Sequence, residues 1–202
     1  MADTKVSALT PLTGANVVPT ADVLLIVDTS ATTDKKILVS ELSLAQNING
    51  TEIDLSSGSP TTADFTIPAW ATRVTVMGKA VSSNGTSALI VQLGDSGGIE
   101  TGSYAGANIN ELGTVTAYSS GYMLANVMNA GNAYEFVLEL TLENASSFTW
   151  MGQSSMSNSN SASKFFSSCG RKSTSAAMTT VRLTTVNGTD AFDAGAVNVL
   201  YS

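Results

Sequence analysis

The pentapeptide at residues 94–98, GDSGG, is the strongest sign of catalytic chemistry in this chain. A serine in this setting can act as a nucleophile when a neighbouring base removes its proton, and that base is commonly an imidazole. The chain contains no histidine, and nothing in the sequence brings Lys79, the nearest lysine along the chain, to Ser96. We therefore interpret the glycines as a turn after a strand at residues 87–93, and we predict no catalytic residue.

Paired carboxylates are the second candidate for catalysis. Residues 134–143 alternate between apolar and polar side chains, which predicts a strand with Glu135, Glu139 and Glu143 on its solvent side. Glutamates four residues apart on a strand are separated by ~13 Å, whereas glycosidases hold their two carboxyl groups ~5 to 9.5 Å apart. A partner on another strand, such as Glu111, stays open. A solvated row is the preferred interpretation, and an enzyme acting on polysaccharide ranks third among the functions considered.

Metal and thiol chemistry have equally little support. Asp190 with Asp193, or Asp95 with Glu100, could supply oxygens to calcium, but neither pair has the spacing of a known calcium loop. The single cysteine, Cys169, has no partner within the chain for a disulfide. We predict no metal site and no cofactor, with calcium at either carboxylate pair left open.

Residues 153–175 are the best candidate for ligand binding. Ser, Asn, Ala and Gly dominate this segment, which we interpret as one long loop, and long loops in β domains often bind ligands. Its cations and aromatic residues are Lys164, Phe165, Phe166, Arg171 and Lys172. Together they could grip a sugar or an acidic polymer on a host surface. The alternative is a connector whose two phenylalanines pack into the domain or a subunit contact.

Short strands and tight turns must position these residues. Asn-Gly pairs beginning at Asn49, Asn84 and Asn187 predict turns, the second of them closing a hairpin between strands at 73–81 and 87–93. Further strands are predicted at 53–55, 65–67, 114–117, 122–127, 134–143, 148–152, 177–186 and 196–201. Trp70 and Trp150 fall in strand-like contexts and are expected in the core or an interface. The fold class predicted is mainly β, with a jelly-roll-like β-sandwich over residues 56–202.

The first 50 residues are organised differently. The apolar run at 23–27 predicts a strand, a polar turn leads to a second strand at 35–39, and Ser40 occupies a helix N-cap position. We predict a strand-turn-strand-helix unit over residues 1–50. A unit this small cannot bury its own apolar surface, so we expect it to dock onto a partner. The docking residues predicted are Val6, Leu9, Leu12, Leu24 and Ile26.

Composition limits the range of partners. The 202 residues are 43% hydrophobic, which suffices for a packed core, but only 12% charged, about half the usual share of ~25%. The 16 acidic residues outnumber the 9 basic ones, and this excess repels nucleic acid and anionic lipid. No apolar stretch approaches the ~18 residues of a membrane span, and no signal sequence is apparent. We expect no nucleic-acid partner, no membrane insertion and retention in the cell that makes the protein.

Two parts of the sequence resemble proteins of tailed bacteriophages. Residues 5–46, KVSALTPLTGANVVPTADVLLIVDTSATTDKKILVSELSLAQ, resemble the amino-terminal leader of tail-fibre and other virion proteins. Residues 65–104, FTIPAWATRVTVMGKAVSSNGTSALIVQLGDSGGIETGSY, and 181–201, VRLTTVNGTDAFDAGAVNVLY, resemble the β-rich distal domain of tail fibres.

The resemblance implies a non-enzymatic virion protein that is made in the bacterial cytoplasm and is commonly a homotrimer. Its leader would contact other virion proteins, and its distal domain would face outward, toward host-surface glycans. The long shaft found between these parts in host-reaching fibres is missing here. We therefore expect a short tail fibre, with a capsid decoration or head-fibre protein as the alternative.

Overall fold

The computed structural model describes residues 23–26, 35–38, 47–159 and 164–202. Contacts divide the chain into two compact units, Met1–Ala45 and Gln46–Ser202. In the first unit, β1 (Val23–Ile26) pairs antiparallel with β2 (Lys35–Leu38), as the sequence predicts. The predicted helix after Ser40 and the predicted docking residues Val6, Leu9 and Leu12 lie outside the described residues.

The second unit consists of two antiparallel sheets. The strands of the larger sheet are β3 (Ile48–Asn49), β4 (Ile53–Asp54), β6 (Arg73–Ser83), β9 (Ala105–Asn110), β10 (Val115–Tyr118), β12 (Tyr134–Asn144), β13 (Thr149–Asn158), β14 (Phe165–Ser173) and β16 (Phe192–Tyr201). Those of the smaller sheet are β5 (Thr62–Thr66), β7 (Leu89–Asp95), β8 (Gly98–Ile99), β11 (Tyr122–Ala125) and β15 (Thr180–Thr185).

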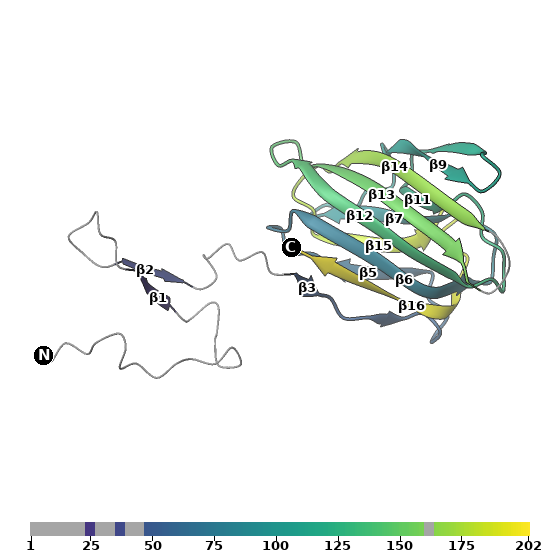
Figure 1. Ribbon diagram of the computed structural model, residues 1–202, viewed down its shortest axis with the longest axis horizontal. Helices are drawn as coiled ribbons and strands as arrows, with labels where there is room; N and C mark the ends of the chain where they lie inside the picture. The colour runs from purple at the N-terminus through teal and green to yellow at the C-terminus, as the bar shows by residue number, and fades with distance from the viewer. Residues whose placement is uncertain (1–22, 27–34, 39–46, 160–163) are drawn as a thin grey trace, which may run out of the picture. The chain divides into compact units, whose positions relative to one another are not determined.

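The larger sheet has nine strands in the order β10-β9-β14-β13-β12-β6-β16-β3, and β4 also pairs with β16. The smaller sheet has five strands in the order β11-β7-β15-β5, and β8 pairs with β7. Figure 1 shows β14, β13, β12, β6 and β16 side by side, with β7, β15 and β5 in a second layer. The mainly β sandwich predicted from the sequence is confirmed. No helix that could span a membrane occurs among the described residues.

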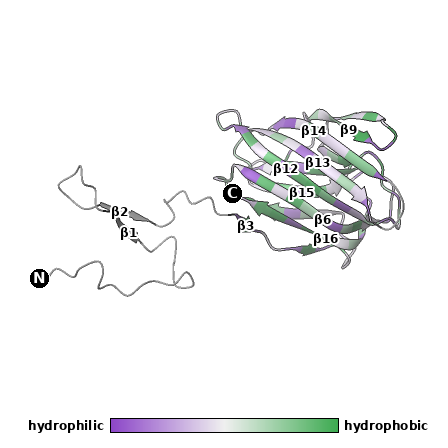
Figure 2. Cartoon of the chain, in the orientation of Figure 1, coloured by the Kyte–Doolittle hydropathy of each residue, from purple (hydrophilic) through white to green (hydrophobic). Residues whose placement is uncertain are grey.

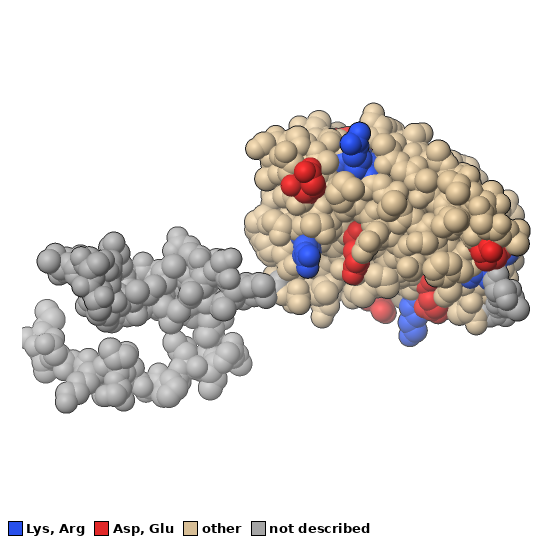
Figure 3. Space-filling view, turned by 45° about the horizontal axis from the view of Figure 1, so that its top comes forward, with Lys and Arg blue, Asp and Glu red and all other residues tan. Residues whose placement is uncertain are grey.

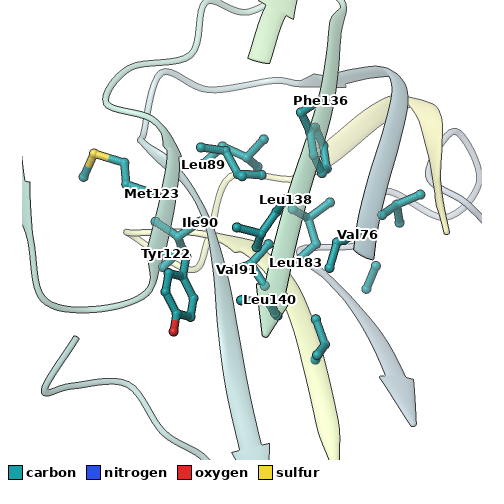
Figure 4. Close-up of a cluster of buried hydrophobic side chains, with 14 of the residues drawn as sticks. Val76, Leu89, Ile90, Val91, Tyr122, Met123, Phe136, Leu138, Leu140 and Leu183 are labelled. Atoms are coloured by element: carbon teal, nitrogen blue, oxygen red, sulfur yellow. The ribbon is translucent and has the colours of Figure 1, made fainter. Parts of the chain in front are cut away.

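The core lies between the two sheets. On β12 the side chains of Tyr134, Phe136, Leu138 and Leu140 alternate inward and are buried, which confirms the alternation predicted for this strand. Figure 4 shows Leu138 and Leu140 together with side chains of the smaller sheet, including Val91 and Leu183. Burying one such side chain contributes roughly 1.5 to 3 kcal/mol, and Trp150 is buried among them as predicted.

Trp70 was expected in the core or in an interface, and the structure excludes only the core. Its side chain is 58% exposed and contacts the ring of Tyr201 edge-on, with 5.9 Å between centroids. It therefore lies outside the core.

The predicted hairpin around Asn84-Gly85 is wrong. β6 pairs with β12 and β16 in the larger sheet, whereas β7 belongs to the smaller sheet, so this turn carries the chain from one layer to the other. The turn is held by Ala191, which follows the Asn187-Gly188 turn: the backbone N–H of Asn84 donates to the carbonyl of Ala191, and the N–H of Ala191 donates to Asn84 Oδ1. Bonds to a distant segment, rather than a local hairpin ladder, thus satisfy its backbone.

The long loop predicted over residues 153–175 is also wrong. β13 and β14 cover most of it and pair antiparallel, with Gln153 opposite Cys169 and Met156 opposite Phe166. Every second side chain points into the core, where Met156 and Phe166 are buried and Ser154 Oγ lies 2.8 Å from Ser168 Oγ. Small polar residues are compatible with these strands because their inward hydroxyls bond to each other across the ladder.

Candidate functional site

The five residues predicted to face a receptor do not form one surface. Alternation along β14 sends Phe165 and Arg171 outward but buries Phe166 and Lys172. Lys164, just before the strand, makes an ion pair with Glu111 at 3.3 Å. The loop that would have gathered these side chains is a strand, so Phe166 and Lys172 cannot contact a receptor from their places in the fold.

Lys172 is committed to an internal ion pair. Its ammonium contacts the carboxylate of Glu100, donates to the carbonyl of Gly102 at 2.9 Å, and lies 5.1 Å from the centroid of the Tyr104 ring. The Tyr104 hydroxyl donates to the carbonyl of Glu100 and accepts from the backbone N–H of Leu93. Burial raises the pKa of Tyr104, and the nearby Glu100 charge adds to this. These contacts hold the segment before β9 against β14.

The GDSGG segment is a tight turn between β7 and β8, as predicted. Asp95 ends β7 and accepts three hydrogen bonds: from Ser175 Oγ at 2.6 Å, and from the backbone N–H groups of Ala176 and Gly97 at 2.8 Å each. Chiefly because of the bond from Ser175, the pKa of Asp95 falls to about 2. An acid this strong stays ionised at neutral pH and anchors the loop after β14.

Of the other carboxylate pair considered for calcium, Asp190 is used within a turn, whereas Asp193 lies on β16. Asp190 accepts from the backbone N–H of Ser87 at 2.9 Å and from the Asn187 side-chain amide at 2.5 Å. These bonds lower its pKa, the Asn187 amide contributing most. Within the described ranges, no group of three or more His, Cys, Asp or Glu residues lies close enough to hold a metal.

The larger sheet presents an extended surface on the side away from the smaller sheet. We call this surface, formed by the outward side chains of β10, β9, β14, β13, β12 and β6, the outer face. One row across it consists of Val115, Ile109, Ser167, Ser155, Val137 and Met77. The next row consists of Ala117, Ala107, Cys169, Gln153, Glu139 and Thr75.

The outer face is unusually apolar for a surface. Exposed fractions are 65% for Val115, 50% for Phe165, 45% for Met151, 43% for Val137 and 42% for Ile109. These five are the majority of the nine large apolar side chains that are exposed in the described part of the chain. Single exposed apolar residues are common on protein surfaces, but these five gather on one face of one sheet. Such a patch is typical of a contact surface.

The outward side of the smaller sheet has the opposite character. It carries Thr62, Asp64 and Thr66 on β5 and Thr180 and Arg182 on β15. Arg182 makes two hydrogen bonds to the carboxylate of Asp64, at 2.7 and 2.6 Å. Over β5 and β15 this side is a normal solvated sheet surface, whereas Ile90 and Gln92, on the same side of β7, are buried.

The outer face is hollowed where its two rows meet. A hollow of about 590 Å³ is lined by apolar Ile109, Val115 and Val137 together with polar side chains such as Gln153 and Ser155. A second hollow of about 340 Å³ lies beside Met77, Val137 and Phe165. Gln153 Nε2 donates to the Glu139 carboxylate at 2.8 Å, so these two side chains are already paired with each other. Such a surface can bind through apolar contact and hydrogen bonds.

Sequence reasoning did not find the outer face. Its apolar residues lie on different strands, and only the sheet register brings Val115, Ile109 and Val137 into one row. Part of the signal was available in the sequence: Trp150 and Met156 are six positions apart, and side chains an even number of positions apart lie on the same side of a strand. This alternation indicates a strand longer than the predicted 148–152. Met151 and Gln153 would then lie on its opposite, outward side.

On the face shown in Figure 3, uncharged residues dominate the surface of the described part, with isolated Lys, Arg, Asp and Glu side chains between them. In Figure 2 most of β13 is pale, the colour of intermediate hydropathy. The outer face therefore combines apolar side chains with small, weakly polar ones.

Comparison with known proteins adds no assignment for this face. No protein-family model matches the chain, and no significant match was found among curated proteins or among solved structures. Its function must be inferred from its own residues.

Proposed function

We propose that the chain is a structural protein of a tailed-phage virion, a short tail fibre that docks through its amino-terminal leader, residues 1–45, and displays its β-sandwich for adhesion to the host surface. The observation that carries the proposal is the division of the chain into two units of unequal size, Met1–Ala45 and Gln46–Ser202. The described core of the larger unit draws on residues between Leu55 and Val199, so this body supplies its own hydrophobic interior. The smaller unit is then available for attachment.

The leader is expected to require a binding partner for stability. Its described part is the antiparallel pair β1 and β2, with four residues in each strand. A two-stranded sheet alone is marginally stable in water. Contact with another virion protein or with sister chains would cover the apolar residues of the leader, of which Val6, Leu9, Leu12, Leu24 and Ile26 are the proposed docking residues.

The features of the sandwich support a role in binding more than a role in catalysis. Its most suggestive motif, around Ser96, is a turn whose Asp95 is held by three hydrogen bonds. Its most distinctive surface, the outer face, is suited to binding. A rigid, weakly charged body that makes contacts is what a fibre tip or a homotrimeric assembly requires.

Deletion of the leader tests the proposal. In the phage that encodes the chain, the full-length protein is expected in purified particles by immunoblot, whereas a version lacking residues 1–45 is expected only in the unassembled fraction. Circular dichroism of the purified truncated protein serves as the control, and it should retain a β spectrum. Equal incorporation of both versions into particles would refute docking through the leader.

A further inference from the structure

The outer face of the nine-stranded sheet has the composition of a protein interface. Interface centres are depleted in charged residues and enriched in aromatic residues and Met, and the outer face exposes Phe165, Met151 and three β-branched side chains. We infer that copies of this chain assemble through the outer face. The inference rests on the proposed function, because it names the surface that joins sister subunits of the fibre.

The two sheets give an internal comparison. Both sheets have an outward side, and on the smaller sheet its exposed part, over β5 and β15, carries threonines and the Asp64–Arg182 ion pair. An antiparallel sheet with one solvated side normally alternates apolar-in and polar-out. Strands β5 and β15 of the smaller sheet follow this rule, while β9, β10, β12 and β13 of the larger sheet each place a large apolar residue outward, where it is exposed. Coverage of the outer face by protein explains the difference.

The apolar surface continues to an edge of the sheet. β10 is the last strand on that side, and Val115 on this strand is the most exposed of the large apolar residues in the row. Leu112, in the turn between β9 and β10, is 80% exposed. Natural proteins protect the edges of sheets because an uncovered apolar edge promotes association. The face and the edge thus form one continuous surface for a neighbour.

The size of the outer face is sufficient for a stable contact. Six strands at ~4.8 Å spacing and about eight residues in length at ~3.3 Å per residue cover roughly 760 Å². A specific protein interface buries about 800 Å² on each partner. The free edge at β10 and the adjoining turn add to the first figure, so the face alone accounts for most of such an interface.

The charges on this surface indicate which partner it fits. The outward positions of its strands carry three cations and three carboxylates, namely Arg73, Lys79, Arg171, Glu135, Glu139 and Glu143. The whole chain has a net charge of −7, yet this face is balanced. A strongly basic or strongly acidic partner gains nothing from a balanced surface, whereas a second copy offers each carboxylate a cation. The occupant we infer is therefore a sister chain.

Cys169 provides a natural reporter. It is the single cysteine of the chain, it lies in the middle of the second row, and it is exposed in the isolated chain. Sister chains packed on the outer face would cover its thiol. The rate at which a reagent modifies this thiol therefore shows whether the outer face is covered, and no cysteine has to be introduced for the measurement.

The experiment combines labelling of the full-length native protein by a thiol reagent with sedimentation velocity. Wild type is expected to sediment as an oligomer whose Cys169 reacts at least ~10-fold more slowly than in the unfolded chain. Val137→Glu places a carboxylate in the interface and should raise the subunit dissociation constant at least ~10-fold and release the thiol. Thr66→Glu places the same charge on the outward side of the smaller sheet. It should leave the subunit dissociation constant and the reactivity of Cys169 unchanged. Ile109→Lys repeats the test with the opposite charge if Val137→Glu does not fold.

Three results would overturn the inference: a wild-type monomer at micromolar concentration, an oligomer whose Cys169 reacts at the unfolded rate, or an oligomer that Val137→Glu and Ile109→Lys leave intact. The second and third would assign assembly to another surface, and the first would assign the outer face to a different protein. Each is distinguishable from failure of the proposed function, which concerns incorporation of the chain into particles through its leader.

Discussion

At the scale of single residues, the charged side chains of the sandwich mainly hold its loops in place. Lys172 points inward from β14 and is 3% exposed, with Glu100 and the carbonyl of Gly102 as partners. A buried ammonium is stable only when such partners replace its hydration. The cation that the sequence suggested for binding a ligand is thus used for structure.

Replacement of Lys172 by methionine is expected to destabilise the fold by about 3 kcal/mol, because Glu100 then loses its cation in a partly buried place. Lys164→Met is the matched control: its pair with Glu111 is more exposed and contributes at most about 1 kcal/mol. Chemical denaturation of both variants measures the two free energies. Equal losses would contradict the structural role of Lys172.

Asp95 should make stability depend on pH in the acidic range. Its carboxylate has a pKa of about 2 in the folded protein, below the ordinary value of 3.8, owing mainly to the Ser175 hydroxyl and the Gly97 N–H. A lowered pKa stabilises the folded state above the unfolded pKa, and this contribution disappears as pH falls through the folded pKa. Asp95→Asn should therefore cost about 2 kcal/mol at pH 7, and the difference from wild type should shrink between pH 4 and 2. Thermal unfolding across this range provides the measurement, and a constant difference would exclude the mechanism.

At the scale of elements, glycines allow two neighbouring strands near one edge of the larger sheet to pack tightly. Gly106 on β9 and Gly170 on β14 lie opposite each other, and the buried Tyr118 extends across both. A Cβ atom on Gly170 would contact the Tyr118 hydroxyl and come within 2.7 Å of the carbonyl oxygen of Ala105. Backbone at that distance cannot move aside without disturbing the ladder.

Gly170→Ala is accordingly expected to cost about 1 to 3 kcal/mol in unfolding free energy. Gly102→Ala controls for the substitution itself, since a Cβ atom added there would have nothing within 4 Å and its effect should stay within about 0.5 kcal/mol. Urea titrations of the two variants decide the matter. Loss of stability only in Gly102→Ala would show that this packing is misassigned.

Strands with large apolar side chains could be predicted from the sequence, whereas strands with small side chains could not. β12 is clear from sequence because large apolar residues such as Phe136 and Leu138 recur at every second position. β9 and β14 are rich in Ala, Ser, Gly and Asn, so no period is visible, and the sequence indicates a loop. The role of the Asn84-Gly85 turn in linking the two sheets could not be predicted for a different reason. The turn is stabilised by hydrogen bonds to Ala191, which is distant in sequence.

At the scale of the molecule, composition predicted the fold class but left the surface undefined. A content of 12% charged residues indicates a weakly charged protein, and the structure shows that large apolar side chains gather on one face. The outer face needs strand order and register, which depend on contacts far apart in sequence. A candidate site assembled from one contiguous segment, as residues 153–175 were, could not have found it.

A chain with a self-sufficient body and a separate leader is suited to attachment at one end and contact at the other. In the proposed account, the leader carries the docking residues and the body carries the outer face, so the two tasks belong to different surfaces. Substitutions on the outer face should therefore impair assembly of the body, while deletion of residues 1–45 should impair attachment alone.

Immunogold electron microscopy of intact particles, with antibody against the sandwich, tests the proposed role most directly. The account predicts gold at the tail, lost when residues 1–45 are deleted. Gold on the head instead would identify a decoration or head-fibre protein, the alternative to a tail fibre. Particles free of gold, from cells that contain the folded chain, would contradict a virion role altogether.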